Sequence, residues 1–538
     1  MKLNRKSLAD IEFWKSNKIA LPQFNLQSTE EHTQEKPAWI HFGAGNIFRG
    51  FVARLQQGLL NDGLSNSGIV AAETFDYDII DQIYHPYDNL SLLVGLMPDG
   101  TTRNEVIGSV TEALKADSSH IDDWQRLSEI FKAPSLQMAS FTITEKGYGI
   151  HGMDGSLSPG VREEAQQGPT KARHAMSVVA ALMHERYLAG AFPLALVSMD
   201  NCSHNGERLK TAVLEIVSLW QENGFVDASF VSYLSDESRV SWPWTMIDKI
   251  TPRPAAEIQE VLLSLGLSDM APVITSKGTY IAPFVNAEIP EYLVIEDRFP
   301  NGRPDLGKVG VYFTDRETVN QTERMKVTTC LNPLHTALAV LGCLLGFTSI
   351  AEEMKDSDLK LLVERIGYDE GMPVVTNPGI IKPEEFLREV IQDRLPNPFI
   401  PDTPQRIATD TSQKVGIRFG ETIKAYISDP ALEVSSLQYI PLTLAAWFRY
   451  LLAVDDTGAS MSISSDPMQE ELQALLRDVR LGDPVSGRGR LSAVLGNESI
   501  FGTDLVACGL SERVEDYFCR MLAGPGAVRQ VLHETLEA

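Results

Sequence analysis

Hydrophobic residues along the first three hundred positions fall into short runs that alternate with amphipathic stretches. Apolar runs that end in glycine or polar residues occupy 38–42, 68–72, 137–144 and 193–199. Helical periodicity lies between or after them, at 51–60, 170–188 and from about 205 onwards. Short apolar runs joined by helical patterns are typical of parallel strands with crossover helices. The pattern therefore predicts an α/β domain over residues 1–318, in which 28–36 forms a loop and Asp248 lies in a turn.

From about residue 320 the alternation gives way to helical periodicity alone. The predicted helices are 332–347, 350–367, 383–393, 416–427, 438–454, 468–479 and 511–522. The segment 395–418 is rich in proline and polar residues, so we expect a long irregular loop or a broken helix there. These features predict a second, mainly helical domain over residues 319–538.

A glycine-rich loop follows the first apolar run directly, in the sequence Gly43-Ala44-Gly45-Asn46-Ile47-Phe48-Arg49. A helical pattern, a second strand and Glu73 come next, which is the order of a dinucleotide-binding unit. The glycines would let a pyrophosphate approach the helix N-terminus, and the Glu73 carboxylate, or alternatively Asp76, would bind the adenosine ribose and favour NAD over NADP. Phe48 replaces the usual third glycine. The alternative to a dinucleotide site is a glycine-rich turn between strand and helix that binds no ligand. The predicted fold is an α/β N-terminal Rossmann-like dinucleotide-binding domain followed by a mainly α-helical C-terminal domain.

A lysine, an asparagine and a histidine precede or open the most apolar helix. Asn332 is a favoured N-cap, Pro333 suits the first helical position, and His335 would fall in the first turn. Lys326 lies ahead of the cap. Each residue also has a purely structural explanation: the lysine could be solvated, the asparagine could cap the helix, and the histidine could be part of the core. Their convergence at the mouth of one helix predicts an active-site corner.

The overall charge and the cysteines limit the partners and the cellular location that the protein can have. A net charge of −25 disfavours nucleic acid and anionic membranes as partners, and an anionic substrate would need a local cluster of Arg and Lys. Five scattered cysteines without a CxxC pair, and an N-terminus without an apolar stretch, predict a reduced cytoplasmic protein. The longest apolar run, 336–347, is too short to span a bilayer. Oligomeric state cannot be predicted from these features.

Seven stretches, in order, resemble the long-chain polyol dehydrogenase family, which includes mannitol 2-dehydrogenase and fructuronate reductase. They span about residues 38 to 480 and are 43–49, 142–148, 198–201, 246–252, 325–335, 406–414 and 446–450. The resemblance implies a zinc-independent, NAD(H)-linked oxidoreductase that interconverts a secondary alcohol and a ketone of an open-chain sugar. It implies Lys326 as general acid/base, Asn201 and Asn332 as donors to the reacting oxygen, His335 as a substrate ligand and Asp248 near the site. It also implies Arg406 and Lys414 at the far end of the substrate, and the cofactor beside Thr144, Glu145 and Lys146.

One departure from the family pattern concerns the spacing of the lysine. The family has four residues between the lysine and the asparagine, whereas Val327 to Leu331 make five here. On a continuous helix the extra residue would rotate Lys326 by about 100° away from the site. We expect the helix to begin at Asn332 and a bulge to absorb the extra residue. Arg324 and Lys249 are the basic alternatives near in sequence.

The substrate class rests on three basic residues in the irregular segment. Arg406, Lys414 and Arg418 would suit a carboxylate, which favours a sugar acid such as D-mannonate/D-fructuronate. A neutral polyol pair of the D-mannitol/D-fructose or arabinitol type stays open, because these side chains also bind hydroxyls. The sequence contains no HExxH motif and no Cys/His cluster at zinc spacing, so no metal site is predicted. The lack of such a motif also disfavours a metal-dependent isomerase or dehydratase. An NAD-binding regulatory protein without turnover is the alternative from a different class.

Overall fold

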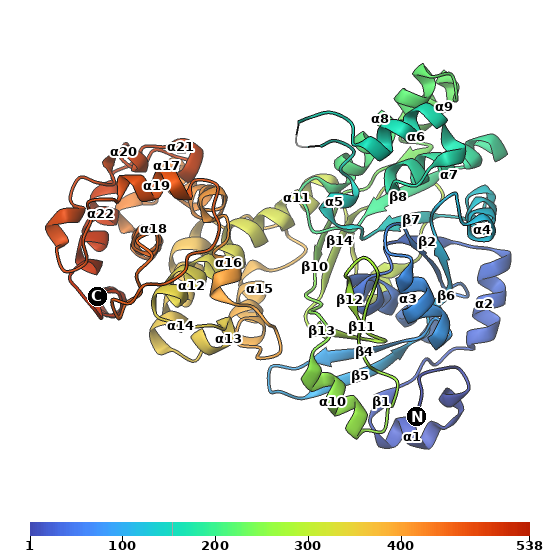
Figure 1. Cartoon of the computed structure of the whole chain (residues 1–538), viewed down its shortest axis with the longest axis horizontal. Coiled ribbons are helices and arrows are strands. Elements are labelled where there is room, and N and C mark those ends of the chain that lie inside the picture. The colour runs from blue at the N-terminus through green and yellow to red at the C-terminus, as the bar shows by residue number, and fades with distance from the viewer. Residues whose placement is uncertain (153) are drawn as a thin grey trace. The chain divides into compact units, whose positions relative to one another are not determined.

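A computed structural model of the chain describes residues 1–152 and 154–538. The chain divides into two compact units, one made of residues 1–97 and 101–319 and the other of residues 98–100 and 320–538 (Figure 1). Each unit has its own buried core.

The first unit is built on a six-stranded parallel sheet. Its strands, in spatial order, are β6 (Val110–Lys115), β3 (Ile69–Glu73), β2 (Trp39–Phe42), β7 (Met138–Phe141), β8 (Leu194–Ser198) and β9 (Val240–Ser241). Numbered along the chain, this order is 3-2-1-4-5-6, which is that of a Rossmann fold. The order reverses between β2 and β7, so this fold places its ligand crevice at the carboxyl ends of these two strands.

Helices cover both faces of this sheet (Figure 1). Alternate strand residues enter opposite cores: Ile40 packs in one and Trp39 in the other. The first core is closed by α4 (Ile121–Lys132), α7 (Ala175–Gly190), α8 (Asn205–Glu222) and α9 (Ala228–Ser235). The second is closed by the π-helix η2 (Phe48–Val52), α3 (Ala53–Asn61) and the π-helix η3 (Ile80–Tyr84). Burial on both faces explains why the strands read as continuous apolar runs.

Three smaller sheets complete the strands of the first unit. They are β1 (Ile19–Ala20), β5 (Thr102–Ile107), β4 (Ser91–Leu96) and β13 (Phe284–Glu288); β10 (Thr245–Asp248), β14 (Tyr292–Glu296) and β15 (Tyr312–Thr314); and β11 (Val273–Ile274) with β12 (Tyr280–Ile281). The remaining helices of eight residues or more are α2 (Leu26–Glu35), α6 (Pro159–Gln167) and α10 (Ala256–Ser264), while α11 (Arg316–Met325) begins in the first unit and ends in the second. Shorter helices are η1 (Ser7–Ala9), α1 (Ile11–Ser16), η4 (His85–Tyr87), α5 (Thr144–Gly147), η5 (Pro169–Lys171) and η6 (Leu306–Val309).

Two predictions for the first unit were wrong. The predicted loop at 28–36 lies in α2, whose N-terminus is capped by the Asn25 side chain. Its buried residues are Thr29 and Thr33, so its inward face carries no apolar periodicity. Asp248 is the last residue of β10, paired with Tyr292 of β14, and does not lie in a turn. The partner strand is more than forty residues away in sequence, which is why the pairing was not visible.

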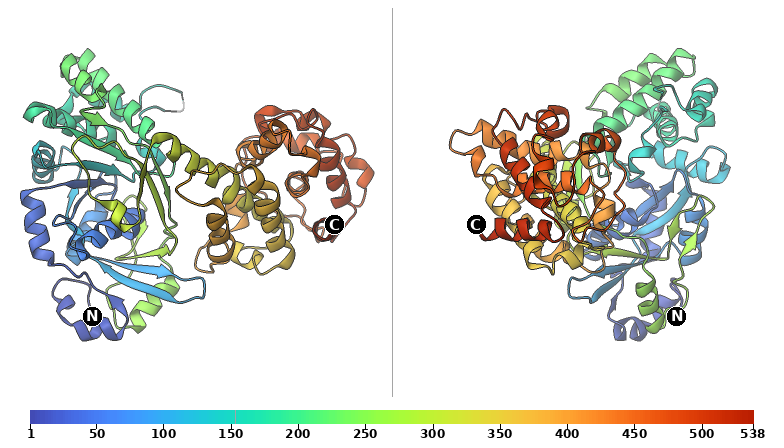
Figure 2. Two further views of the ribbon diagram at one scale, coloured as in Figure 1. Left: turned by 180° about the vertical axis from the view of Figure 1, so that it is seen from behind. Right: turned by 60° about the vertical axis from the view of Figure 1, so that its left-hand side comes forward.

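The second unit is helical (Figure 2). Its longer helices are α12 (Asn332–Leu344), α14 (Ser357–Glu364), α17 (Glu421–Ser428), α18 (Tyr439–Tyr450), α22 (Ser511–Met521) and α23 (Ala527–Glu537). Its shorter α-helices are α13 (Ile350–Glu353), α15 (Pro383–Glu389), α16 (Pro404–Ile407), α19 (Gln469–Leu475), α20 (Ser492–Leu495) and α21 (Glu498–Phe501). Its 3-10 helices are η9 (Met372–Val374), η11 (Thr411–Gln413), η13 (Val434–Ser436) and η14 (Pro484–Gly487). The apolar helix α12 packs against α18 in the core.

The predicted helix over 350–367 is broken into α13, α14 and the π-helix η8 (Arg365–Gly371). The break occurs because the Asp356 carboxylate accepts from the backbone N–H groups of Asp358 and Leu359 and so starts a new helix. The predicted broken segment contains α16 and η11, as expected. Further π-helices are η7 (Lys326–Cys330), η10 (Val390–Arg394) and η12 (Gly416–Gly420). Such turns carry one extra residue and are frequent at functional sites.

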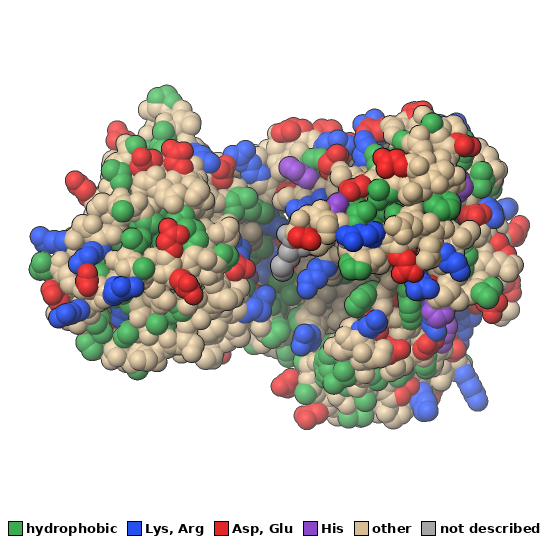
Figure 3. Space-filling view, turned by 45° about the horizontal axis from the view of Figure 1, so that its top comes forward, with side chains coloured by type: hydrophobic (Ala, Val, Ile, Leu, Met, Phe, Trp, Pro, Cys, Tyr) green, Lys and Arg blue, Asp and Glu red, His purple; other side chains and the backbone are tan. Residues whose placement is uncertain are grey.

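The surface carries both signs of charge. On the face in Figure 3, acidic and basic side chains are interspersed over each unit. Within residues 1–152 and 154–538, one helical stretch, Arg316–Leu344, is long and apolar enough to cross a membrane, but 78% of its apolar window is buried. That burial is typical of a core helix in a folded unit.

Candidate active site

The predicted nucleotide loop contains Gly43 and Gly45, and Gly50 follows it in η2; each glycine is required for a different structural reason. Gly43 has φ +100°, and a Cβ there would lie 2.1 Å from the carbonyl oxygen of Thr142 at the end of β7. A Cβ on Gly45 would meet no atom of the described residues within 4 Å, so a ligand can approach the backbone there. A Cβ on Gly50 would lie 2.8 Å from Val285 Cγ1, so Gly50 permits the close helix–strand packing of the usual third glycine. The loop therefore fits a dinucleotide pyrophosphate at the switch point.

Glu73 fastens this loop to the end of β3. Its Oε2 accepts from the Ala44 N–H at 2.8 Å, and its Oε1 accepts from the N–H groups of Thr74, Phe75 and Asp76 at 3.0, 2.9 and 3.3 Å. The carboxyl group is buried; burial raises its pKa, and the backbone bonds oppose that rise. Glu73 is thus a structural brace of the glycine loop, a role that the sequence did not reveal.

The competing carboxylate, Asp76, is also buried. Its Oδ2 accepts from the Thr275 hydroxyl at 2.6 Å, and its Oδ1 has no hydrogen-bond partner among the residues that the structure describes. The backbone N–H of Ser276 donates to Asp78 at 2.7 Å, so the β11–β12 hairpin is held against the turn after β3. Both candidate ribose ligands therefore have partners within the protein.

A buried cation lies in the first turns of the helix after the loop. Arg49 donates to the carbonyl of Ala282 and to Asn46 Oδ1, each at 2.9 Å. Burial lowers the pKa of Arg49 to about 10. Phe48 is buried with its ring stacked on His41, at 4.3 Å between centroids, and Ile47 packs against the same core. The positive charge and the N–H groups of the first helical turn both favour an anion beside the loop.

Asp200 joins the ends of β7 and β8. Its carboxylate accepts from the N–H groups of Ile143 and Thr144, both at 2.9 Å, and from the Tyr148 hydroxyl at 2.6 Å. Burial raises the pKa of Asp200, and these three bonds oppose that rise. Thr144 has φ +64°, a conformation that costs a threonine roughly 1–2 kcal/mol. The predicted cofactor residues Thr144, Glu145 and Lys146 form α5, and Asn201, exposed, follows Asp200 directly.

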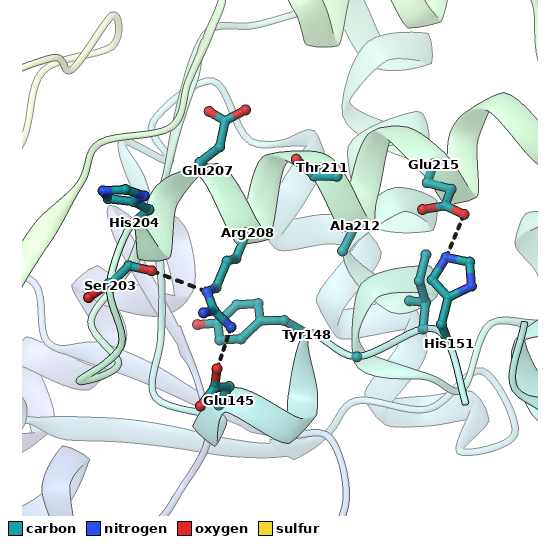
Figure 4. Close-up of a pocket in the computed structure, with 12 residues that line it drawn as sticks. Glu145, Tyr148, His151, Ser203, His204, Glu207, Arg208, Thr211, Ala212 and Glu215 are labelled. Carbon is teal, nitrogen blue, oxygen red and sulfur yellow. Dashed lines mark hydrogen bonds and ion pairs between the residues drawn. The ribbon is translucent and has the colours of Figure 1, made fainter. Parts of the chain in front are cut away.

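A hollow of about 500 Å³ lies beside this strand end (Figure 4). Its walls come from α5, the loop after it and the first half of α8. Arg208 crosses it to pair with Glu145 and also donates to the carbonyl of Ser203 at 3.1 Å; His151 pairs with Glu215 at 2.8 Å. The charged side chains drawn in Figure 4 are thus largely paired with one another.

The two basic alternatives to Lys326, Lys249 and Arg324, each pair with a glutamate. Lys249, next to the buried Asp248, donates to the Glu288 carbonyl at 2.6 Å and to Glu291 at 2.9 Å, and its side chain is 3% exposed. Arg324 is exposed and pairs with Glu421 at 2.8 Å. Lys326 itself is buried as the first residue of η7.

The extra residue between Lys326 and Asn332 is absorbed by the π-helix η7. The Leu331 N–H donates to the Lys326 carbonyl at 3.1 Å, an i→i+5 bond, and α12 then begins at Asn332. The expected bulge is therefore found as a π-turn. The cap prediction was wrong by one residue: Leu331 occupies the N-cap position and Pro333 the second helical position. The Asn332 carboxamide is consequently not used in capping.

The irregular segment brings the three predicted substrate cations together beside α12. Arg418 donates to Thr336 Oγ1 at 2.5 Å, and burial lowers its pKa to about 10. Lys414 donates to the carbonyls of Ile407 and Thr409, and its pKa is lowered by burial and by the charges of Arg418 and Arg406. Arg406 pairs with Asp402, which also contacts His335 Nε2 at 3.3 Å.

The predicted residues fall into one set in each unit. The first unit holds the glycine loop, Glu73, α5, Asn201 and Asp248, and the second holds Lys326, Asn332, His335, Arg406, Lys414 and Arg418. Sequence reasoning missed Asp200 and Asp402. Asp200 directly precedes Asn201, and Asp402 precedes Arg406 by one helical turn, so spacing could have suggested both. Among the described residues, no three His, Cys, Asp or Glu side chains gather as metal ligands.

Comparison with known proteins gives matches across the whole chain. The mannitol dehydrogenase Rossmann domain model matches residues 37–308, and the mannitol dehydrogenase C-terminal domain model matches 318–521. D-mannonate oxidoreductase of Thermotoga maritima is 52% identical over 538 residues, covering 100% of this chain and 99% of that protein. D-mannonate oxidoreductase of Escherichia coli is 28% identical over 484 residues, covering 88% and 91%. The structure of Pseudomonas fluorescens mannitol 2-dehydrogenase with NAD and D-mannitol is 28% identical, covers 100% and 99%, and has a TM-score of 0.67.

These matches agree with the strand order and the glycine loop of the first unit and with the helical second unit. The two domain models together cover most of the sequence. The chain therefore belongs to the mannitol dehydrogenase family of NAD-dependent oxidoreductases that act on CH–OH groups.

Proposed function

We propose that this protein interconverts D-mannonate and D-fructuronate with NAD(H). The full-length relative at 52% identity is named D-mannonate oxidoreductase. The observation that carries the proposal is the cluster of Arg406, Lys414 and Arg418 beside α12, in a protein whose net charge is −25. A carboxylate is the substrate group for which such a cluster is most useful.

The first unit binds the cofactor in this proposal. The pyrophosphate lies against Gly43 to Arg49, where the backbone is open at Gly45 and the helix N-terminus favours an anion. Glu73 accepts from the adenosine ribose through its remaining lone pair. The nicotinamide lies at Thr144, Glu145 and Lys146, at the sheet's switch point. A bound NAD would supply the hydride acceptor for oxidation of the alcohol carbon, and a bound NADH would supply the hydride donor for the reverse reaction.

The remaining residues act on the sugar. Lys326 takes the hydroxyl proton on oxidation and returns it to the carbonyl oxygen on reduction. Asn201 and Asn332 donate their amide N–H groups to that oxygen and stabilise its developing negative charge. Asp248 is the acidic residue of the site, and His335 binds a neighbouring hydroxyl. No step of this scheme requires a metal ion.

Arg418 is the best-suited ligand for the substrate carboxylate. Arg406 already pairs with Asp402, and Lys414 is held by two backbone carbonyls. Arg418 has a neutral partner, Thr336, and no carboxylate of the described chain contributes to its pKa. A buried guanidinium is stabilised by an anion, which a sugar acid supplies and a neutral polyol does not.

Two alternatives stay open to experiment. A neutral polyol such as D-mannitol is favoured by the likeness to mannitol 2-dehydrogenase, whose solved complex contains D-mannitol. An NAD-binding protein without turnover is the alternative from another class.

The proposed location is the cytoplasm. The five cysteines are free thiols, which supports a reducing, cytoplasmic location.

The test is NADH oxidation with fructuronate, tagaturonate and fructose in parallel, with and without EDTA. Fructuronate turnover that EDTA leaves unchanged, and that Lys326→Ala abolishes while Lys249→Ala does not, would support the proposal. Preferential turnover of fructose would replace it with a polyol dehydrogenase. NADH binding without turnover of any sugar would favour the regulatory alternative.

A further inference from the structure

The Asp402 carboxylate contacts two residues that the proposed function places against the sugar. Its Oδ2 lies 3.3 Å from His335 Nε2, and its Oδ1 accepts from Arg406 Nη2. The Asp402 and His335 side chains are 13% and 16% exposed, whereas that of Arg406 is 61% exposed. The Asp402–His335 contact is therefore the more shielded of the two.

The backbone of Asp402 is fixed independently of these side chains. Its N–H donates to the Ile400 carbonyl at 2.8 Å, and its carbonyl accepts from the Ile350 N–H at the start of α13 at 3.0 Å. His335 is equally fixed, because its N–H donates to Leu331 at the start of α12. The carboxylate and the imidazole thus meet on two anchored segments.

Asp402 stays ionised in this arrangement. Burial raises its pKa, but hydrogen bonding to His335 and Arg406 and the charge of Arg406 lower it, so the pKa lies below its usual value. An ionised carboxylate only accepts hydrogen bonds. The hydrogen bond to Asp402 therefore requires the proton of His335 to sit on Nε2, and in the neutral ring this leaves a lone pair on Nδ1.

His335 Nδ1 has no hydrogen-bond partner among the residues that the structure describes. A ring nitrogen with a lone pair accepts from a hydroxyl and cannot donate to a carbonyl. The ring can therefore distinguish a substrate hydroxyl from a substrate carbonyl at the position that it faces.

We propose that Asp402 is a positioning residue that holds His335 as the Nε2–H tautomer, so that Nδ1 accepts a hydrogen bond from a hydroxyl beside the reacting carbon. The same carboxylate holds Arg406, so one residue aligns two substrate ligands. This inference rests on the proposed function for the identity of the sugar, but the Asp402–His335 geometry does not depend on it.

The first measurement is the tautomer itself. In protein labelled with ¹⁵N-histidine, the ¹⁵N shifts and long-range couplings of His335, assigned with His335→Gln, report which ring nitrogen carries the proton. We expect Nε2–H in the wild type and a mixture of tautomers in Asp402→Asn, because a carboxamide can either accept from or donate to Nε2. A wild-type ring protonated on Nδ1 alone would overturn the proposal even if no sugar were turned over.

The second measurement is kinetic. Asp402→Asn should lower kcat/KM for the sugar by roughly 10- to 100-fold while the KM for NADH stays within about twofold. Asp402→Glu should restore part of that loss. The matched control is Asp369→Asn, which breaks an exposed ion pair with Arg365 in the same unit and should leave the kinetics unchanged.

Two further variants separate the possible causes. If Arg406→Met alone reproduced the loss and Asp402→Asn added nothing to it, the effect would come from Arg406 and the His335 role would be rejected. With an analogue that lacks the neighbouring hydroxyl, Asp402→Asn should lose no more activity than Arg406→Met loses, because only the contribution of Arg406 remains. A further loss with that analogue would contradict a hydroxyl contact. If Asp402→Asn failed to fold, Asp402→Glu would provide the same two measurements.

Discussion

The Asp200 carboxylate accepts the backbone N–H of Thr144 at 2.9 Å, across the carboxyl ends of neighbouring strands β7 and β8. Thr144 has the left-handed φ of +64°, which a threonine adopts only when its surroundings hold it there. Asp200 and Tyr148 provide those constraints, since the Tyr148 hydroxyl bonds both Asp200 and Ser198. The turn that we assign to the nicotinamide is therefore held by a half-buried carboxylate that follows the next strand.

Replacing Asp200 by asparagine should weaken cofactor binding. The amide turns one acceptor oxygen into an NH₂ group that faces the N–H of Ile143 or Thr144, so one of these two donors loses its partner. We expect the KM for NADH to rise by roughly tenfold or more, with a smaller effect of Tyr148→Phe, which removes one bond of the three. Steady-state kinetics and fluorescence titration with NADH measure this. Wild-type affinity for NADH in Asp200→Asn would show that the turn at Thr144 keeps its conformation without the Asp200 carboxylate.

The two loop glycines should respond differently to alanine. Gly43→Ala places a Cβ 2.1 Å from the Thr142 carbonyl oxygen at a positive φ, so we expect lower thermal stability as well as lost NADH binding. Gly45→Ala meets no described atom within 4 Å, so the free protein should keep its melting temperature while NADH binding weakens. Differential scanning fluorimetry with and without NADH separates the two. Equal loss of stability in both variants would contradict the assignment of Gly45 to the ligand side.

The parts of this fold that could be predicted from the sequence are those with local signals. Buried parallel strands are apolar runs, and the glycine loop lies within one βαβ unit, so both were recognised. The helix α2 was missed because its buried positions are Thr29 and Thr33, which are polar and give no apolar periodicity. Local spacing could have marked Asp200 and Asp402 as candidates, but their contacts could not be predicted, because their partners Thr144 and His335 are 56 and 67 positions away. Side-chain contacts over such separations leave no periodicity to read.

The buried Glu353 should make stability depend on pH. It is 0% exposed, and neither of its carboxyl oxygens has a hydrogen-bond partner in the described chain. Burial, with a smaller contribution from the charge of Asp356, raises its pKa to about 9 from the ordinary 4.5. Between these two values the unfolded chain ionises Glu353 while the folded protein keeps it protonated. The unfolded state then binds fewer protons, so the free energy of unfolding decreases as pH rises through this window.

Glu353→Gln should remove this contribution. The stability of the variant relative to the wild type should increase by at least about 1 kcal/mol between pH 5 and pH 9. Urea unfolding at pH 5, 7 and 9 measures the difference. The exposed Glu385→Gln variant is a control, since its carboxylate pairs with Lys382 on the surface. A stability difference between Glu353→Gln and wild type that does not change with pH would contradict a protonated Glu353.

The π-turn at Lys326 makes a prediction about chain length. Because η7 contains one residue more than an α-helical turn, deleting Val327 should convert it to continuous α-helix and keep Lys326 on the same side as Asn332 and His335. We expect the deletion variant to fold and to keep kcat within about tenfold of wild type. Inserting one alanine at the same point should rotate Lys326 by about 100° and lower kcat by roughly 100-fold or more. Circular dichroism establishes that each variant is folded, and single-turnover NADH oxidation gives the rate. An active insertion variant together with an inactive deletion variant would show that the π-turn itself, and not the direction of Lys326, is what catalysis requires.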